Sequence, residues 1–335
     1  MPDWQSGNQA PSQGERTMGS VNGSNVNIPA WLTPYLFLAP ALLVLLAVVF
    51  LPALQAFQLS FMEYGFDVTQ PPEWVGLANF ETLLKDDTFW QTLKNTVVYL
   101  VCVVPILAIA PLLLAILVNQ KLKGIHWFRV AYYTPVVVSM VVAGIAWNWL
   151  YAEKGLLNFL LTGMLNAIER IPLLGHWLEP FLPSLVSIPW LTDPDWALFS
   201  VMAVTVWKGL GYYMVIYLAG LQALPADLYE AAAIDGSDGW RKHWDITLPL
   251  MRPYIFLVSV ISAIAATKVF EEVFVMTSGG PRNASKTVVY YVWESAFSDL
   301  EYGYACTIGL VLFLIILALS FVRLALSNPA EAGPV

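Results

Sequence analysis

The chain has 335 residues and a formal net charge of −8, with 58% hydrophobic and 12% charged residues. Soluble domains carry about 25% charged residues, so this composition and a mean hydropathy of +0.64 exclude an ordinary soluble protein and indicate an integral membrane chain. The pI near 4.9 argues against a nucleic-acid-binding surface. Cys102 and Cys306 each lie in an apolar segment, so we expect neither a disulfide framework nor a metal site.

Long apolar segments follow an N-terminal tail, residues 1–30, whose Gln, Ser, Asn and Gly content predicts disorder. Most of these segments approach or exceed the roughly 20 residues that cross a ~30 Å hydrocarbon core. The first should remain as an uncleaved helix, because Arg16 is the only basic residue ahead of it. We predict an all-α transmembrane domain at residues 31–328, followed by a tail at 329–335, with about six spans near 36–57, 96–119, 130–151, 197–222, 254–276 and 303–325.

The connection between the third and fourth spans, residues 152–195, is long and contains a further apolar stretch near 162–186. Glu169, Arg170 and His176 interrupt this stretch. We therefore expect one or two amphipathic helices along the outer surface rather than a further pair of spans.

The polar segment 224–250, between the fourth and fifth spans, carries a spaced pattern. Pro225 suits the start of a helix and Gly236 can take the left-handed conformation that ends one, so we predict a short helix over about 225–235. Ser237 or Asp238 is expected to cap a second helix, which Pro249 and Pro253 should end. The pattern itself is EAA-x3-G-x9-I-x-LP, formed by Glu230, Ala231, Ala232, Gly236, Ile246, Leu248 and Pro249.

Orientation follows from basic residues in short loops. The loop after the second span holds Lys121, Lys123 and Arg129, which predicts a cytoplasmic position. Counting spans from this loop places both termini and the segment 224–250 in the cytoplasm. The bias is modest, because basic residues also occur in the segments placed outside.

Ionisable residues within the apolar spans are the first candidates for a solute path, because a charge in a bilayer usually faces a cavity or a partner. Lys208, Lys268 and Glu271, with Glu272 beside it, are such positions. The other reading is that Lys268 and the two glutamates simply neutralise one another on one helix. Aromatic and amide neighbours suited to a polyhydroxyl ligand are Trp147, Asn148, Tyr212 and Tyr213, although Trp147 also fits an interfacial aromatic belt.

The EAA pattern resembles the coupling loop of ATP-binding-cassette (ABC) importer permeases. The blocks WVGLANF at 74–80, WKGLGYYMVIYLAGLQALP at 207–225 and KVFEEVFVMTSGGP at 268–281 are similar to the sugar-type branch, which includes the maltose and glycerol phosphate permeases. The resemblance covers about residues 35–325. It implies the type I importer permease fold in a bacterial inner membrane, in contact with lipid.

The resemblance also implies partners: a second permease subunit, two ABC ATPase subunits and an extracytoplasmic solute-binding protein. Glu230, Ala231, Ala232, Asp235 and Gly236 would dock into the ATPase, while Ile246, Leu248 and Pro249 would brace the loop against the membrane helices. The connection 152–195 would contact either the binding protein or the partner permease.

The chain carries no G-x-x-x-x-G-K-[ST] phosphate loop, so ATP and Mg²⁺ are expected on the partner ATPase and no cofactor on this chain. Its three histidines are far apart and form no catalytic motif, so we expect no catalytic residues and no enzyme. A neutral sugar or polyol glycoside is the favoured solute, with glycerol phosphate as the alternative. An ATP-independent secondary transporter and a membrane scaffold are the alternatives of a different class.

Overall fold

The computed structural model describes residues 29, 33–65, 67, 69, 71–120, 122–169 and 187–326. The chain divides into two compact units, Met1–Ala53 and Leu54–Val335. The predicted C-terminal tail, residues 170–186 of the long connection and nearly all of the N-terminal tail lie outside the described residues.

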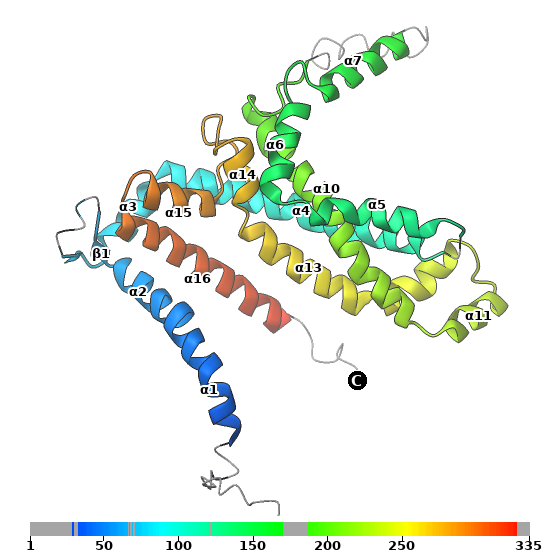
Figure 1. Cartoon of the computed structure of the whole chain (residues 1–335), viewed down its shortest axis with the longest axis horizontal. Helices are drawn as coiled ribbons and strands as arrows, with labels where there is room; N and C mark the ends of the chain where they lie inside the picture. The colour runs from blue at the N-terminus through cyan, green and yellow to red at the C-terminus, as the bar shows by residue number, and fades with distance from the viewer. Residues whose placement is uncertain are drawn as a thin grey trace, which may run out of the picture. The chain divides into compact units, whose positions relative to one another are not determined.

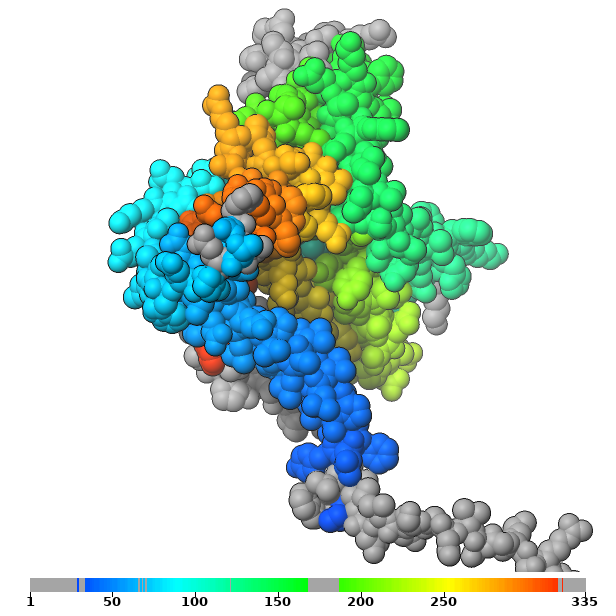
Figure 2. Space-filling model, turned by 60° about the vertical axis from the view of Figure 1, so that its left-hand side comes forward, coloured from blue at the N-terminus to red at the C-terminus, as the bar shows by residue number. Residues whose placement is uncertain are grey.

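Apart from Pro29, the described part of the first unit is one helical stretch. It consists of α1 (Thr33–Leu45), the π-helix η1 (Leu46–Phe50) and the beginning of α2 (Leu51–Leu59). The stretch Pro34–Leu59 is 26 residues long and none of its apolar window is buried; Figure 2 draws its side chains in blue. A helix that is apolar on all sides needs lipid or another protein around it.

The second unit is built around α4 (Asp87–Val118), the longest helix of the described chain. It packs against α10 (Pro194–Ala223) and α13 (Arg252–Thr267) (Figure 1). Its buried side chains Tyr99, Val103 and Leu107 meet Val201 and Tyr217 in the main apolar core. The helix α16 (Tyr302–Leu326) spans the range of the sixth predicted span.

Close helix contact depends on one glycine of α10. A Cβ atom built on Gly211 would lie 2.1 Å from the carbonyl oxygen of Tyr132 in α5 (Ile125–Val137). Small residues allow two backbones to approach in this way. Gly211 therefore sets how closely α10 lies against α5.

The helix is interrupted within two of the predicted spans. Residues 130–151 form α5 and α6 (Met140–Leu150), which meet at an angle of 100°. Pro135 lacks the amide hydrogen that would bond back into α5, and Ser139 Oγ accepts a hydrogen bond from the amide of Val142 at 3.4 Å, which begins α6 as a new helix.

The fifth predicted span, 254–276, is also interrupted. The helix α13 ends at Thr267 and α14 (Glu271–Met276) begins after Phe270. Thr287 Oγ1 donates to the carbonyl of Val269 at 3.0 Å, which satisfies a backbone acceptor that the break leaves without a helical donor. Among the described residues three helices are long and apolar enough to span a membrane, or up to five if α5 with α6, and His243–Leu250 with α13, each count as one bent span. The six-span count therefore stays a prediction.

Several shorter elements precede or connect the long helices. The segments before α4 form a two-stranded antiparallel hairpin, β1 (Met62–Glu63) with β2 (Glu73–Trp74), and α3 (Ala78–Lys85). Within the long connection, α7 (Leu156–Glu169) begins earlier than the predicted 162–186 stretch. The predicted coupling segment contains α11 (Ala226–Ile234), the π-helix η2 (His243–Thr247) and α12 (Leu248–Leu250).

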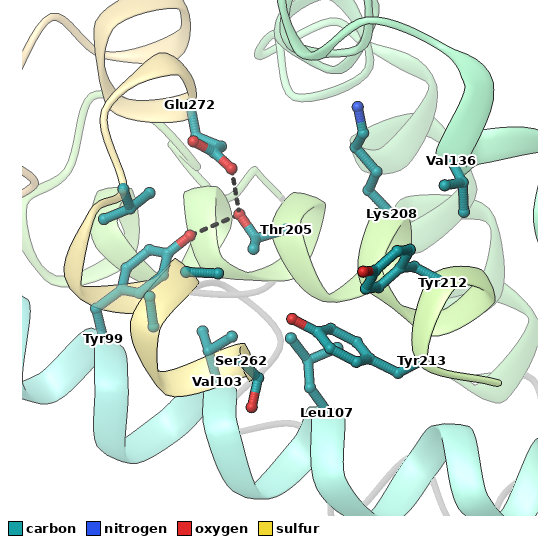
Figure 3. A pocket seen from close by; sticks show the side chains of 14 residues that line it. Tyr99, Val103, Leu107, Val136, Thr205, Lys208, Tyr212, Tyr213, Ser262 and Glu272 are labelled. Carbon is teal, nitrogen blue, oxygen red and sulfur yellow. Dashed lines mark hydrogen bonds between the residues drawn. The ribbon is translucent and has the colours of Figure 1, made fainter. Parts of the chain in front are cut away.

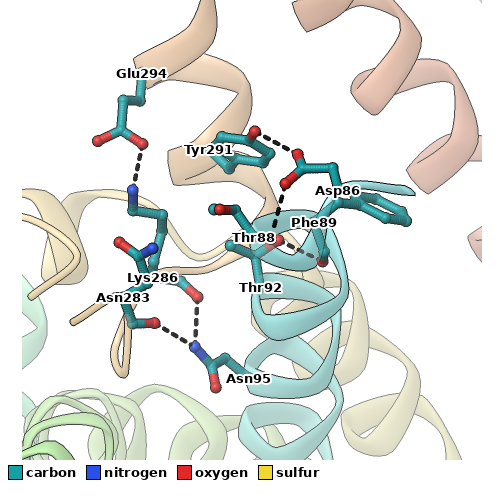
Figure 4. Close-up of polar contacts among 9 residues, drawn as sticks. All are labelled: Asp86, Thr88, Phe89, Thr92, Asn95, Asn283, Lys286, Tyr291 and Glu294. Carbon is teal, nitrogen blue, oxygen red and sulfur yellow. Dashed lines mark hydrogen bonds and ion pairs between the residues drawn. The ribbon is translucent and has the colours of Figure 1, made fainter. Parts of the chain in front are cut away.

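The loop between α14 and α15 (Val288–Phe297) is tied to the start of α4. Asn95 Nδ2 donates to the carbonyl oxygens of Asn283 at 2.8 Å and Lys286 at 2.9 Å (Figure 4). The ammonium group of Lys286 forms an ion pair with Glu294. The Asn95 contacts fix the loop, although Asn95 and Lys286 are 191 residues apart in sequence.

Asp86 links four helices, because it lies between α3 and α4 and its side chain bonds to residues of α15 and α16. Its carboxylate accepts hydrogen bonds from the hydroxyls of Tyr291 at 2.6 Å and Tyr304 at 2.7 Å, and from the amide of Thr88 at 2.8 Å. Burial raises the pKa of Asp86, but these hydrogen bonds outweigh burial and the pKa lies below its usual value. The ionised form of Asp86 is therefore the one that the fold stabilises.

Candidate functional site

A cavity of about 280 Å³ lies where α4, α10, α13 and the two helix breaks meet (Figure 3). Its volume is near the lower end of ligand pockets, which is about 300 Å³. Most of its wall is apolar, with Val103 and Leu107 of α4 and Ala266 of α13 among the lining residues. A few polar groups interrupt this wall, which is the arrangement expected of a site that orients a small ligand.

The polar groups form a line centred on Thr205 of α10. Its hydroxyl lies 2.6 Å from the hydroxyl of Tyr99 and donates to Glu272 Oε1 at 3.4 Å. Figure 3 shows Thr205 between Tyr99 and Glu272, with Tyr212 and Tyr213 on the other side of the cavity. The cavity thus presents hydroxyl groups and one carboxylate opposite two aromatic rings.

Both interrupted helices contribute to the cavity wall. Val136 precedes the break between α5 and α6, and Val269 lies within the break between α13 and α14. Irregular backbone at membrane depth is tolerated where it is buried in protein or lines a cavity, and discontinuous helices form solute sites in many transporters. The two helix breaks therefore lie at the cavity wall, as expected of a solute site in a transporter.

Lys208 lines the cavity but its ammonium group is already engaged. Nζ donates to the carbonyl of Val138 at 2.6 Å, and Val138 is the C-cap residue directly after α5. This carbonyl would otherwise lack a partner at the break. The first chemical role of Lys208 is thus to hold the bend between α5 and α6.

The structure brings together only part of the candidate path. Lys208, Tyr212 and Tyr213 line the cavity, whereas Lys268 and Glu271 are exposed outside its wall. The idea that Lys268 and the glutamates share one helix is wrong, because α13 ends before Lys268 and α14 starts at Glu271.

Trp147 and Asn148 of α6 also lie outside the cavity wall. The Trp147 ring contacts the rings of Tyr151 and Trp207, with centroids 5.3 and 5.4 Å away. Asn148 Nδ2 donates to the carbonyl of Val275 at 3.2 Å. In this structure both residues pack α6 against its neighbours.

Sequence reasoning missed the lining residues Tyr99, Thr205 and Ser262. It also chose Glu271 rather than Glu272 as the candidate solute-path residue, whereas Glu272 lines the cavity. A single hydroxyl residue in an apolar helix gives no signal, because it satisfies itself equally well by bonding back to its own helix. Glu272 was visible as a charge within a span, but only the break before α14 decides that it, and not Glu271, faces the cavity.

The coupling segment follows directly from the C-terminal end of α10. α11 ends in a turn in which Gly236 has φ +79° and the amide of Ser237 donates to the carbonyl of Ala232 at 2.8 Å. A left-handed residue of this kind is the usual C-terminal stop of a helix. The predicted helix over 225–235 and its glycine corner agree with this geometry.

Other details of the predicted segment are wrong. Ser237 Oγ donates to Asp245 Oδ2 at 2.7 Å rather than capping the second helix, and π-helix η2 has no side-chain cap. Pro249 lies within α12 and does not end it. The segment does end at Leu250, and Pro253 lies in the first turn of α13, which begins at Arg252 after a 57° bend. Proline is compatible with a first helical turn because no amide donor is needed there.

The segment has one exposed and one inward face. Glu230, Ala231, Asp235 and Gly236 are exposed, and Ile234, with 87% of its surface accessible, lies among them. Ala232 is buried, while Ile246 and Leu248 are half-buried and Pro249 is exposed. Tyr229 turns inward, where its hydroxyl lies 3.1 Å from Thr247 Oγ1. The exposed face is small-sided with an apolar tip, which suits a contact with another protein.

The comparisons with known proteins agree with this architecture. The family described as "Binding-protein-dependent transport system inner membrane component" matches residues 85–327. The chain is 33% identical over 295 residues to the probable ABC transporter permease protein YurN of Bacillus subtilis, covering 87% of this chain and 94% of that protein. It is 32% identical over 294 residues to the lactose transport system permease protein LacF of Rhizobium radiobacter, covering 86% and 92%.

A solved structure shows the same fold. A chain of a bacterial ABC transporter involved in the import of the acidic polysaccharide alginate superposes with a TM-score of 0.71 at 23% identity, covering 89% of this chain and 96% of that chain. The predicted all-α importer permease fold is thereby confirmed, as is the predicted resemblance to the sugar-type branch. The chain belongs to the inner membrane components of binding-protein-dependent transport systems, and it is a permease subunit of an ABC importer rather than an enzyme.

Proposed function

We propose that this permease carries a neutral carbohydrate or polyol glycoside through the cavity around Thr205. Relatives support the solute class: besides the lactose permease, an arabinooligosaccharides transport system permease protein of Bacillus subtilis is 34% identical over 297 residues. The observation that carries the proposal is the line of Tyr99, Thr205 and Glu272 opposite two tyrosines.

The chemistry of that line suits a sugar. Sugar rings have apolar C–H faces, which pack on aromatic rings, and hydroxyl edges, which need both donors and acceptors. Tyr212 and Tyr213 supply rings, the Thr205 hydroxyl both donates and accepts, and the Glu272 carboxylate accepts. A solute without hydroxyl groups would leave unused the hydrogen-bonding capacity that these polar atoms retain beyond their contacts with one another.

A second candidate is a glycerol phosphate-type solute. The sn-glycerol-3-phosphate transport system permease protein UgpA of Agrobacterium fabrum is 32% identical over 299 residues. A phosphate, however, would meet the Glu272 carboxylate, and the cation nearest in the wall, Lys208, already donates to Val138. Like charges in a low-dielectric site repel strongly, so the neutral solute is the better fit.

The coupling segment is proposed to dock into an ABC ATPase that binds ATP and Mg²⁺. Glu230, Ala231, Asp235 and Gly236 offer an exposed face, while Ile246 and Leu248 brace the segment. ATP-driven closure would then move α11 and, through α10, the cavity wall. In this scheme the chain works with a second permease subunit, two ATPases and a solute-binding protein, with both termini and the segment 224–250 in the cytoplasm.

The test of the solute class is ATP hydrolysis by the reconstituted complex, stimulated by the binding protein and screened against neutral glycosides and glycerol phosphate. A glycoside is expected to stimulate hydrolysis. Thr205→Val and Glu272→Gln should lower its uptake, because the first removes a hydroxyl and the second replaces one acceptor oxygen of the carboxylate by an amide donor; loss of one such bond costs about 1–3 kcal/mol.

Glu271→Gln is the matched control, since this neighbouring carboxylate is exposed outside the cavity wall. If Glu271→Gln and Glu272→Gln change uptake equally, the cavity is not the solute path. Stimulation by glycerol phosphate alone would replace the carbohydrate by the second candidate.

A further inference from the structure

An apolar cavity of about 330 Å³ lies beside the coupling segment, away from the proposed solute path. Leu112 and Leu113 of α4 form one wall, Ile255 of α13 another, and Trp240 and Trp244 a third. The two tryptophans are 62% and 68% exposed. Exposed tryptophans next to a membrane helix are typical of the level of the lipid headgroups.

A second cavity of about 300 Å³ adjoins the first, because Ile116, His243 and Thr247 line both. Its character is different: Asn119, Gln120, Tyr229 and Lys242 line it, and its described lining contains no carboxylate.

Lys242 keeps its positive charge available to a ligand. The neighbouring Arg241 is paired with Asp245 at 3.2 Å, whereas Lys242 forms no ion pair with the described residues. An apolar cavity therefore continues into a polar, cationic one, which is the shape and charge distribution of an anionic amphiphile.

We infer that the two cavities hold one anionic glycerophospholipid, with its phosphate at Lys242 and an acyl chain along Trp244. The inference rests on the proposed function in one respect, namely that the coupling segment lies at the cytoplasmic leaflet. Charge complementarity selects this occupant, because a lipid with no net charge would gain little from Lys242. A purely apolar occupant would leave the polar cavity unused.

The occupant would touch the part of the chain that transmits force. Thr247 Oγ1 lies 3.1 Å from the hydroxyl of Tyr229 in α11 and 3.1 Å from His243 Nδ1 in η2. These three residues also line the polar cavity. A lipid headgroup there holds η2 against α11, and π-helical turns such as η2 often occur at functional sites. The lipid thereby regulates how well ATP hydrolysis is coupled to transport.

The test uses the complete transporter in nanodiscs that contain phosphatidylcholine with or without phosphatidylglycerol. Lipid retained by the complex is measured by native mass spectrometry, and hydrolysis stimulated by the binding protein is measured in parallel. Lys242→Gln removes the cation, and Trp244→Ala removes the apolar wall. Lys123→Gln and Trp149→Ala are matched controls, because both residues are exposed and line neither cavity.

The expected result is that phosphatidylglycerol raises coupled hydrolysis and stays bound to the unaltered complex. Lys242→Gln should lower its retention about fivefold, which corresponds to the ~1 kcal/mol of one lysine at an anionic lipid surface. Trp244→Ala should lower it as well, and both controls should retain it. A photo-crosslinker placed at residue 244 should yield a lipid adduct.

Equal retention in all four variants would overturn the inference, as would a crosslink from residue 244 to a protein chain, which would assign the groove to a subunit contact. Size-exclusion profiles identify any variant that fails to assemble. For such a variant the retention result is set aside, and the adduct from the photo-crosslinker at residue 244 decides between lipid and protein as the occupant. Loss of lipid retention with intact glycoside transport refutes only the lipid site. Retained lipid in a complex that no glycoside stimulates refutes only the proposed function.

Discussion

Gly211 gives the sharpest test of how the membrane helices pack. In Gly211→Ala the new Cβ would lie 2.1 Å from the carbonyl oxygen of Tyr132 and 3.0 Å from the Cα of Tyr133. Both atoms belong to backbone and cannot rotate away, so α10 and α5 must move apart. Overpacking of this kind costs about 1–3 kcal/mol, and alanine returns ~0.5–1 kcal/mol by its better helix propensity.

Because the clash is with fixed backbone atoms, we take the upper end of the overpacking range, ~3 kcal/mol, and expect a net loss of about 2 kcal/mol in the free energy of unfolding. With an unfolding entropy of ~2.1 cal/mol/K per residue and 335 residues, this loss lowers the melting temperature by about 3 °C. The assay is the fraction of detergent-solubilised chain that stays monodisperse after heating, measured as a function of temperature.

Two glycines of the same chain provide graded controls. In Gly309→Ala the Cβ meets nothing within 4 Å, and in Gly209→Ala the nearest atom, at 2.8 Å, is the end of the flexible Leu107 side chain. The expected order of melting temperatures is Gly309→Ala highest, Gly209→Ala next and Gly211→Ala lowest. If Gly211→Ala is as stable as Gly309→Ala, the close approach of α10 to α5 is not present in the folded protein.

Three further predictions concern side chains that hold the unit together. Lys208→Met should reduce transport and cost about 1–3 kcal/mol in stability, because the Val138 carbonyl loses its donor; Lys268→Met, at an exposed position, should change neither thermal stability nor uptake. Asn95→Ala frees two backbone carbonyls of the loop between α14 and α15 and should raise hydrogen exchange there while exchange in α11 stays the same. The lowered pKa of Asp86 means that its contribution to stability is complete above the usual aspartate value of 3.8. This contribution is lost as the pH falls from there through the folded pKa, so Asp86→Asn should have a lower melting temperature at pH 7 and a flatter pH dependence below pH 5; identical slopes for both proteins would remove Asp86 from this role.

The apolar segments and the EAA pattern were strong enough to predict helices and the coupling corner. The span at 197–222 lies within α10 and the helix at 225–235 contains α11, because hydrophobic runs and a glycine stop are local signals. Such signals depend only on neighbouring residues.

The helix breaks could not be predicted in the same way. The sequence PVVVSMVV around Val138 is almost entirely apolar, and its backbone is satisfied by Lys208, which lies 70 residues away. The cavity has the same origin, since Tyr99 and Thr205 are 106 residues apart. Tertiary packing decides which face of α4 meets which face of α10, and neither sequence periodicity nor a single hydroxyl reveals it.

The central claim is that this permease moves its solute only when an ATPase acts on the exposed face of α11. The most direct measurement is uptake of a glycoside into vesicles that contain the complete transporter, with Glu230→Lys compared to Glu153→Lys. Both glutamates are exposed, but only Glu230 lies on the coupling segment. The account predicts that uptake requires ATP and that Glu230→Lys abolishes it in a correctly assembled complex while Glu153→Lys transports normally. Uptake without an ATPase subunit, or equal transport by the two variants, would contradict it.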